Sequence, residues 1–340
     1  MKKEQTEKKK KDPKKRGKGL KIFLCILASL AVFFTVINLI PPKKVTEKNP
    51  FIKEESALPM IAAHRGGGVS NPENTLMAFR AAVNDFGIQI CETDVWMTND
   101  GHLVFSHDGS INRMACEEGA EKVNIGEHSL QELRAYNMGY NFKDPKSGEY
   151  IYRDKTEEEQ EALGLKILEF HELLEEFYDT RKDLLFIVEI KNGGDVGFKA
   201  AEIMDRCLTE RFPDYKKNLV VGTFHPEIED NLKAMHPTLM RGASTKGAAT
   251  FVITQMLGVN LFTGADFTCL QIPMSYNIKG IKLDLTWKTY INRAHRRNIA
   301  VQYWTINDAD EMRFLIEKNV DCIMTDDPLL LKQVLEEYKK

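Results

Sequence analysis

The chain has few cysteines, and none of them stands in a spacing typical of metal binding or redox chemistry. Its 340 residues contain six cysteines, and no two of them form a C-x-x-C pair. Cys25 lies inside a long apolar run, which leaves five, an odd number that cannot all pair. A fully paired disulfide framework is therefore excluded. Cys91, Cys269 and Cys322 lie in apolar stretches and are predicted to be buried, inert thiols.

The sequence also has only one long apolar run and no clear internal repeat. Residues 60–340 continue without a low-complexity break, a length that suits one large domain or two small ones. The net charge of −3 hides an asymmetry, because the first 21 residues hold eleven Lys and Arg against three acidic residues, about +8. This basic run is predicted to be disordered. The apolar run that follows it argues against a nucleic-acid-binding tail, so no nucleic-acid partner is expected.

The apolar run, Ile22–Ile40, is predicted to be a transmembrane helix. It has 16 apolar residues out of 19 and no charge, and as a helix it would span about 28 Å of a bilayer core of about 30 Å. Eleven Lys and Arg precede it and only four follow closely, so the positive-inside rule places the N-terminus in the cytoplasm. The alternative is a cleaved signal peptide, but the run exceeds a typical apolar region of that kind and no A-x-A site follows it.

These patterns predict a single-pass cell-membrane protein with an extracellular domain. Residues 1–21 would form a basic cytoplasmic tail, 22–40 the transmembrane helix, 41–58 a polar linker that begins with two prolines, and 59–340 the domain. No protein partner is evident from the sequence.

The domain alternates short apolar runs with amphipathic segments, which predicts a (β/α)8 TIM barrel. The predicted strands are Met60–Ala63, Gln89–Val95, Leu185–Ile190, Leu219–Gly222, Leu239–Arg241, Phe267–Ile272, Ala300–Trp304 and Cys322–Thr325. The predicted helices are Thr75–Asp85, Phe170–Tyr178, Phe198–Arg211, Trp287–Arg297, Ala309–Lys318 and Pro328–Tyr338. Residues 109–164 are charged and rich in loop formers, and we expect a small insertion there, after the second strand. Asn298 and Asn319 are expected to end helices in the left-handed conformation.

The stretch from Ile88 to Asp108 carries the densest chemistry. Glu92 and Asp94 share one face of a predicted strand, and two neighbouring carboxylates in a half-buried place repel each other unless a cation lies between them. A tight turn then brings back His107. Two carboxylates and an imidazole are typical of a metal-assisted acid/base site. A solvated strand end with a surface histidine is the alternative.

A third carboxylate, Glu189, ends another predicted strand and shares a face with Lys191. Because the C-terminal ends of barrel strands meet at one mouth, we expect Glu189 near Glu92 and Asp94. Three carboxylates without a cluster of cysteines or histidines favour a hard divalent cation, Mg2+ or Ca2+.

The domain resembles the glycerophosphodiester phosphodiesterase family over essentially Met60 to Leu335. The matching motifs are HRG at 64–66, PENT at 72–75, ETD at 92–94, NDG at 99–101, HD at 107–108, EIK at 189–191, WTIN at 304–307 and VDCIMTDDP at 320–328. The resemblance implies a barrel with a small insertion after the second strand. It implies a divalent cation on Glu92, Asp94 and Glu189, and an acid/base pair of His64 and His107. It also implies that Arg65 and Lys191 meet the phosphate and that Trp304 lines the glycerol side of the pocket.

The implied reaction is hydrolysis of a small or lipid-derived glycerophosphodiester to an alcohol and glycerol 3-phosphate, through a cyclic phosphate formed by the neighbouring 2-hydroxyl. His64 is favoured as the base and His107 as the acid. Two alternatives are a sphingomyelinase D-like lyase, which releases the cyclic phosphate, and a non-catalytic phosphate- or glycan-binding barrel. Glu73 of the PENT motif is assigned equally to the pocket and to the surface, and His225 to the surface rather than to substrate specificity.

Overall fold

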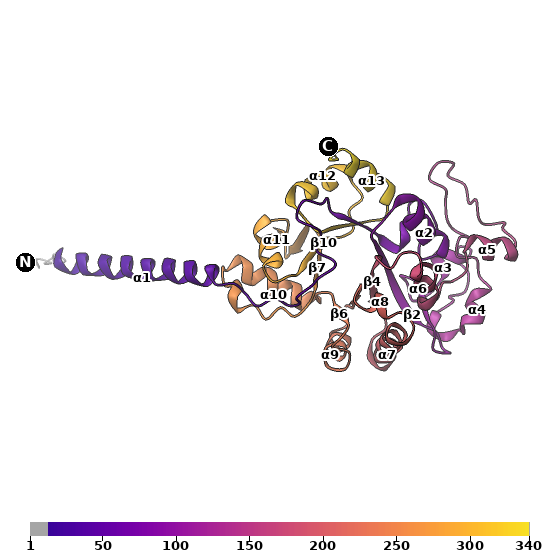
Figure 1. Cartoon of the computed structure of the whole chain (residues 1–340), viewed down its shortest axis with the longest axis horizontal. Helices are drawn as coiled ribbons and strands as arrows, with labels where there is room; N and C mark the ends of the chain where they lie inside the picture. The colour runs from indigo at the N-terminus through magenta and orange to yellow at the C-terminus, as the bar shows by residue number, and fades with distance from the viewer. Residues whose placement is uncertain (1–12, 340) are drawn as a thin grey trace, which may run out of the picture.

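The computed structural model describes residues 13–339, so the first twelve residues of the predicted cytoplasmic tail lie outside the described range. Between residues 13 and 339, a single helix is long and apolar enough to cross a membrane, over Lys18–Leu39. It belongs to α1 (Pro13–Leu39), which extends away from the rest of the molecule in Figure 1. The prediction that the basic run up to Lys21 is disordered is wrong from Pro13 onwards. Proline is well suited to a first helical position, and lysine and arginine are good helix formers, so the helix begins nine residues before Ile22.

Eight parallel strands form the barrel, and all eight predicted strands are confirmed. Their order around the barrel is β6-β5-β4-β2-β1-β11-β10-β7. The parallel bridge between Gly242 and Cys269 closes the ring, and the Thr268 N–H donates to the Arg241 carbonyl at 2.8 Å there. The strands are β1 (Met60–Ala63), β2 (Ile90–Met97), β4 (Leu185–Ile190), β5 (Leu219–Gly222), β6 (Met240–Arg241), β7 (Cys269–Ile272), β10 (Ala300–Tyr303) and β11 (Cys322–Thr325).

Helices surround the strands and bury an apolar layer against them (Figure 1). The connections contain η1 (His64–Gly66), α2 (Leu76–Arg80), η2 (Ala81–Phe86), α6 (Phe170–Tyr178), α7 (Gly194–Glu210), α8 (Pro213–Lys216), α9 (Pro226–Met235), α10 (Thr245–Met256), η4 (Asn260–Phe262), α11 (Lys288–His295), α12 (Ala309–Lys318) and α13 (Pro328–Glu336). Asn298 and Asn319 have φ values of 60° and 66°, which confirms the predicted left-handed residues after α11 and α12.

The segment between α1 and the barrel packs against the end of the barrel opposite the strands' C-terminal ends. Phe51 is completely buried and joins the small core inside the barrel. The Asn49 amide donates to the carbonyls of Thr268 and Asn298 at 2.8 and 2.9 Å. The polar linker predicted over 41–58 is therefore fixed to the barrel around Asn49 and Phe51.

An insertion and a hairpin depart from the regular alternation. The insertion follows β3 (Leu103–Phe105), which pairs antiparallel with β2, and it contains α3 (Asn112–Ala115), η3 (Ile125–Glu127), α4 (Leu130–Arg134) and α5 (Glu157–Leu163). It has its own apolar core, so the prediction of an insertion beside the barrel is confirmed. The hairpin of β8 (Ser275–Ile278) and β9 (Ile281–Asp284) follows β7 and was not predicted.

Candidate functional site

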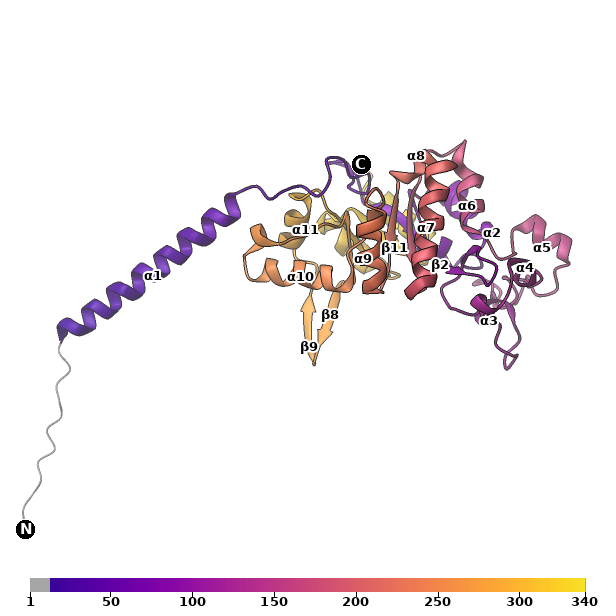
Figure 2. The same ribbon diagram turned by 90° about the horizontal axis from the view of Figure 1, so that it is seen from below.

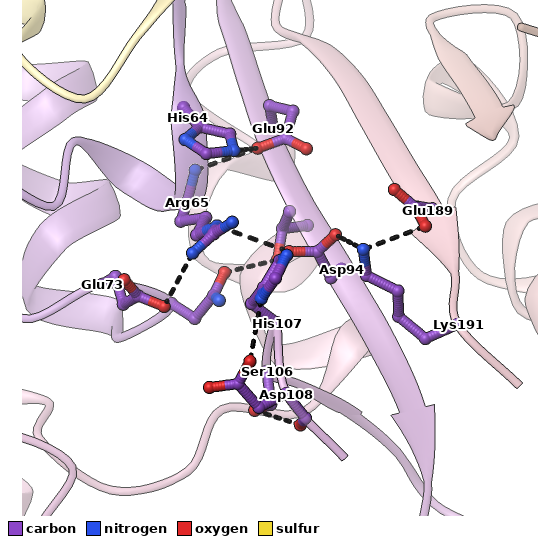
Figure 3. Close-up of polar contacts among 12 residues, drawn as sticks. His64, Arg65, Glu73, Glu92, Asp94, Ser106, His107, Asp108, Glu189 and Lys191 are labelled. Atoms are coloured by element: carbon purple, nitrogen blue, oxygen red, sulfur yellow. Dashed lines mark hydrogen bonds and ion pairs between the residues drawn. The ribbon is translucent and has the colours of Figure 1, made fainter. Parts of the chain in front are cut away.

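Carboxylates from two neighbouring strands meet at the C-terminal end of the barrel. Glu92 and Asp94 on β2 are 6% and 2% exposed. Asp94 lies in register with Glu189 on β4, so their side chains share one side of the sheet. The Lys191 Nζ atom lies 2.9 Å from both Asp94 Oδ1 and Glu189 Oε1 (Figure 3). The structure therefore brings together the three predicted carboxylates and the predicted lysine.

Arg65 enters the site from the sharp turn after β1. Its backbone is left-handed, with φ at 54°, and its N–H donates to Glu92 Oε2 at 3.0 Å. The next residue, Gly66, has φ at 82°, and a Cβ there would stand 2.9 Å from the Ala78 side chain, which explains a glycine after the arginine. The guanidinium points between Glu73 and Asp94, at 3.4 and 3.7 Å (Figure 3).

Burial makes these carboxylates costly to ionise. Burial, with the nearby Asp94 charge, raises the pKa of Glu92 to about 7. Burial and Asp94 also raise the pKa of Glu189, against the opposing effect of Lys191. For Lys191 burial alone would lower the pKa, but the charges of Asp94 and Glu189 outweigh it and raise the pKa. The three carboxylates therefore carry more negative charge than the two nearby cations, Arg65 and Lys191, can neutralise.

The carboxylates Glu92, Asp94 and Glu189 are suitable ligands for a hard cation, although they are not arranged in a finished metal site. Among residues 13–339, no three acidic, histidine or cysteine side chains are arranged as a ready ligand group. The Lys191 ammonium lies between Asp94 and Glu189 instead. Asp94 Oδ2 and Arg65 Nε are both buried without a hydrogen-bond partner. Orphaned buried polar atoms are rare in folded proteins, and a carboxylate oxygen of this kind suits a bound cation.

His64 lies between two carboxylates at the end of β1. Its Nδ1 atom is 2.5 Å from Asp326 Oδ1, and its Nε2 atom is 3.9 Å from Glu92 Oε2. Burial alone would lower the pKa of His64, but the charges of Glu92 and Asp326 and the Asp326 hydrogen bond outweigh it and raise the pKa. The imidazole therefore presents Nε2 to the carboxylate cluster.

His107 follows β3 and is more exposed than His64, with 38% of its side chain accessible against 14%. Its Nδ1 atom lies 3.0 Å from Asp108 Oδ1. Burial would raise the pKa of Asp108, but hydrogen bonds from Arg113 and His107 lower it below its usual value. Each histidine thus has an aspartate at Nδ1, and Figure 3 shows both imidazoles around the pair of Arg65 and Asp94.

Arg113, on α3 of the insertion, was missed by the sequence analysis. Its guanidinium donates to Asp108 Oδ2 at 2.7 Å and to Glu73 Oε1 at 2.6 Å. Because Glu73 also contacts Arg65, a continuous chain of contacts joins Arg65 to His107. Glu73, which the sequence had left between pocket and surface, is mostly buried and lies beside Arg65. No motif marks Arg113, since only the folding of the insertion brings it beside the mouth.

Other candidates lie at the edge of the site or outside it. Trp304 directly follows β10 and packs partly buried against the small core inside the barrel. His225 is half exposed, and its Nε2 atom lies 3.0 Å from the Lys191 carbonyl oxygen, so it contacts the backbone of a site residue. Thr75 caps α2, whereas the Asn74 side chain accepts a hydrogen bond from Thr93 at 2.8 Å.

The cysteines and the remaining histidines have structural roles. Cys91, Cys269 and Cys322 are completely buried, as predicted, and burial raises the pKa of Cys91 to about 12. An acidic side chain contacts each of His102, His171, His236 and His295, and a backbone carbonyl contacts His128.

Comparison with known proteins agrees with this geometry. The model of the glycerophosphoryl diester phosphodiesterase family matches residues 64–330. A glycerophosphodiester phosphodiesterase of Caldanaerobacter subterraneus subsp. tengcongensis is 26% identical over 269 residues, which cover 79% of this chain and 94% of that protein.

Solved structures share the fold. The glycerophosphoryl diester phosphodiesterase domain of a Mycobacterium tuberculosis protein matches with a TM-score of 0.64 at 16% identity, covering 82% of this chain and 99% of that one. An Oleispira antarctica phosphodiesterase, solved in complex with the product sn-glycerol-3-phosphate, matches with a TM-score of 0.60 at 21% identity, covering 82% and 97%. This chain therefore belongs to the glycerophosphoryl diester phosphodiesterase family.

Proposed function

We propose that the protein hydrolyses glycerophosphodiesters to an alcohol and glycerol 3-phosphate. The observation that carries this proposal is the meeting of two histidine–aspartate pairs with Arg65 and Lys191 at the mouth of the barrel. Relatives with similar sequences bear the name of this activity. A non-catalytic binding barrel would not need two imidazoles, each held by an aspartate, beside the same cationic pair.

Arg65 and Lys191 are proposed to bind the phosphodiester. Arginine offers a planar fork of donors for phosphate oxygens, and lysine adds a point charge on the other side of Asp94. Members of this family generally use a divalent metal ion, and Glu92, Asp94 and Glu189 would hold Ca2+ or Mg2+ here. That cation would neutralise negative charge that grows on the phosphate oxygens during the displacement.

His64 is proposed as the base. Asp326 accepts a hydrogen bond from Nδ1–H of His64, and this leaves the Nε2 lone pair free to take the proton of the attacking hydroxyl. The nearby carboxylates raise the pKa of His64, and a stronger base takes that proton more readily. The attacking group is the 2-hydroxyl of the glycerol, already tethered to the phosphate, which removes the entropic cost of a second molecule.

His107 is proposed as the acid, and it gives a proton to the oxygen of the departing alcohol. Asp108 contacts the Nδ1 atom of His107. The imidazole of His107 is more exposed than that of His64, which suits the side of the site where the alcohol leaves. The displacement produces a cyclic phosphate, which water then opens as the histidines exchange roles. Trp304 would line the glycerol side of this pocket.

We further propose that α1 anchors the enzyme in the cell membrane, with the N-terminus in the cytoplasm and the barrel outside. The apolar stretch Lys18–Leu39 and the charge asymmetry around it support this placement. The substrate would be a small-molecule or lipid-derived diester, and a lipid-derived one would be met at that surface.

A panel of glycerophosphodiesters tests the function, assayed with Ca2+ and with Mg2+ and followed by product analysis. Release of glycerol 3-phosphate together with the free alcohol is expected. Accumulation of the cyclic phosphate as the final product would identify a lyase of the sphingomyelinase D type instead. The His64→Ala/His107→Ala double variant serves as the control for contaminating hydrolases, and an equal rate in that control would overturn the proposal.

A further inference from the structure

The hairpin β8–β9 exposes a continuous apolar face at the mouth of the barrel. In its register Tyr276 lies opposite Leu283, and Ile278 opposite Ile281, so these four side chains share one face. Tyr276, Ile278 and Ile281 are 55%, 47% and 66% exposed, whereas Leu283 packs against the barrel core. Ser275, Asn277, Lys282 and Asp284 occupy the opposite face. A two-stranded ribbon with one apolar face left in water is marginal by itself and indicates a missing apolar contact.

A second exposed apolar group lies where α1 meets the barrel. It consists of Ile253, Met256, Leu257 and Phe262, on and directly after α10 and in η4, each more than half exposed. Together with Tyr276, Ile278 and Ile281 we call these side chains the apolar rim.

The end of α1 is fixed beside the apolar rim. The Asn38 amide donates to the Gly258 carbonyl at 2.9 Å, and Arg293 donates to the Asn38 side chain at 2.7 Å. Arg296 donates to the carbonyls of Asn38 and Ile40 at 2.9 and 3.1 Å. These contacts hold the apolar helix at a defined place on the barrel rather than on a free tether.

The hairpin and α1 extend to the same side of the molecule. Figure 2 shows α1 descending from its junction with the barrel near α10, and the hairpin projecting below the barrel. The hairpin follows β7, so it marks the mouth at the C-terminal ends of the strands. The mouth of the barrel therefore faces the side to which α1 runs.

We infer that the apolar rim contacts the surface of the lipid bilayer that holds α1, so that the catalytic mouth opens onto that surface. Tyrosine and isoleucine side chains are suited to the boundary between headgroups and acyl chains. Lys279 lies in the turn between β8 and β9, at the tip of the hairpin, and its positive charge complements anionic headgroups. This inference rests on the proposed anchoring by α1, and it makes a diester that resides in the bilayer a substrate of the same site.

Site-directed fluorescence on the full chain tests the contact. Cys25→Ser and Cys207→Ser remove the accessible thiols, and Ile281→Cys or Lys282→Cys then carries one environment-sensitive dye on either face of the hairpin. The protein is placed in vesicles of phosphatidylcholine and phosphatidylglycerol that contain a spin-labelled acyl chain as quencher. The dye at 281 should shift to the blue and be quenched, whereas the dye at 282 stays in water. If both dyes remain in water, or if both are quenched, the inference is overturned. A protein partner would then be the occupant of the apolar rim.

Kinetics separate this inference from the proposed activity. The Ile278→Ser/Ile281→Ser variant should keep its rate on water-soluble glycerophosphocholine. Its kcat/KM for lysophosphatidylcholine in the same vesicles should fall by roughly tenfold, as apolar contact with the bilayer is lost. Equal loss on both substrates, or on neither, would overturn the role of the rim. Inactivity of the unmodified chain on both substrates would overturn the proposed function, and the dye comparison would still decide the contact.

Discussion

The Nδ1 atom of His64 lies 2.5 Å from Oδ1 of Asp326, and this contact joins the first and last strands of the barrel. The strands β1 and β11 are neighbours, so the two residues meet at the barrel mouth although 262 positions separate them in sequence. Asn307 donates to the other oxygen of Asp326 at 2.7 Å. Burial would raise the pKa of Asp326, but His64 and Asn307 lower it, so the carboxylate stays ionised and orients the imidazole.

Asp326→Asn should lower kcat by roughly two to four powers of ten, because the amide can hold the wrong tautomer of His64. Asp326 is one of the groups that raise the pKa of His64, so removing its charge lowers that pKa. A base works when deprotonated, and the acidic limb of kcat/KM should therefore move to lower pH. The measurement is a pH–rate profile of both forms.

Asp326→Glu, which keeps the charge, is the matched variant and should restore some of the rate. An unchanged acidic limb in Asp326→Asn, despite a lower rate, would show that Asp326 acts on the fold and not on His64.

The sequence predicted the strands well because each one is a short apolar run between polar loops. The ends of these strands then identified Glu92 and Glu189 as candidate site residues. Partners across the barrel were harder to predict. Asp326 stood at the end of a predicted strand, but nothing in sequence spacing joins it to His64. Arg113 lies in an insertion without regular periodicity, and only the folded insertion brings it to Glu73. The hairpin β8–β9 was missed because Ser275–Asp284 alternates too briefly to differ from a loop.

Metal removal should abolish turnover, and Ca2+ or Mg2+ should restore it. Glu92→Gln and Glu189→Gln should each reduce the rate by orders of magnitude, because a neutral amide is a poorer ligand for a hard cation. Added cation should raise the thermal unfolding midpoint of the unmodified chain and leave that of both variants nearly unchanged. Glu118→Gln, at an exposed position of the insertion, is the control. Full activity in excess chelator would refute the metal dependence.

The barrel should be accessible from outside the cell. Protease added to intact cells without an outer membrane should digest the catalytic domain and leave a membrane-bound fragment that contains α1. This outcome follows from the excess of Lys and Arg before Ile22. Protection of the barrel would reverse the orientation, and a soluble extracellular form that lacks the residues before Pro41 would show cleavage in place of anchoring.

Glu169 should make stability depend on pH. It lies 2.9 Å from His102 and 3.2 Å from His171, and it holds the start of α6 to β3 and the insertion. The hydrogen bond to Glu169 raises the pKa of His171 above 6.5, so this stabilisation is complete below pH 6.5 and is lost as pH rises through the raised value. Burial opposes ionisation of Glu169, but the histidines lower its pKa below 4.5, so its contribution is complete above pH 4.5.

Glu169→Gln should therefore lower the free energy of unfolding most between about pH 4.5 and 6.5, by up to about 1 kcal/mol, because the histidines that contact this buried carboxylate are partly exposed to water. Thermal unfolding in detergent across this range measures the difference, with Glu118→Gln as control. A difference that is constant with pH would mean that Glu169 acts through packing alone.

The two histidines should respond differently to the leaving group. His64→Ala and His107→Ala should each lower turnover of glycerophosphocholine by roughly two to four powers of ten, the range for positioned acid/base groups. A diester with an acidic leaving group, such as nitrophenol, needs no proton at the departing oxygen, so it should largely spare His107→Ala and remain poor for His64→Ala. The reverse pattern would exchange the two roles.

A diester without the 2-hydroxyl should be a very poor substrate for the unmodified enzyme, because the tethered nucleophile is gone. Its cleavage at the normal rate would mean that water attacks the phosphate directly and that no cyclic phosphate forms.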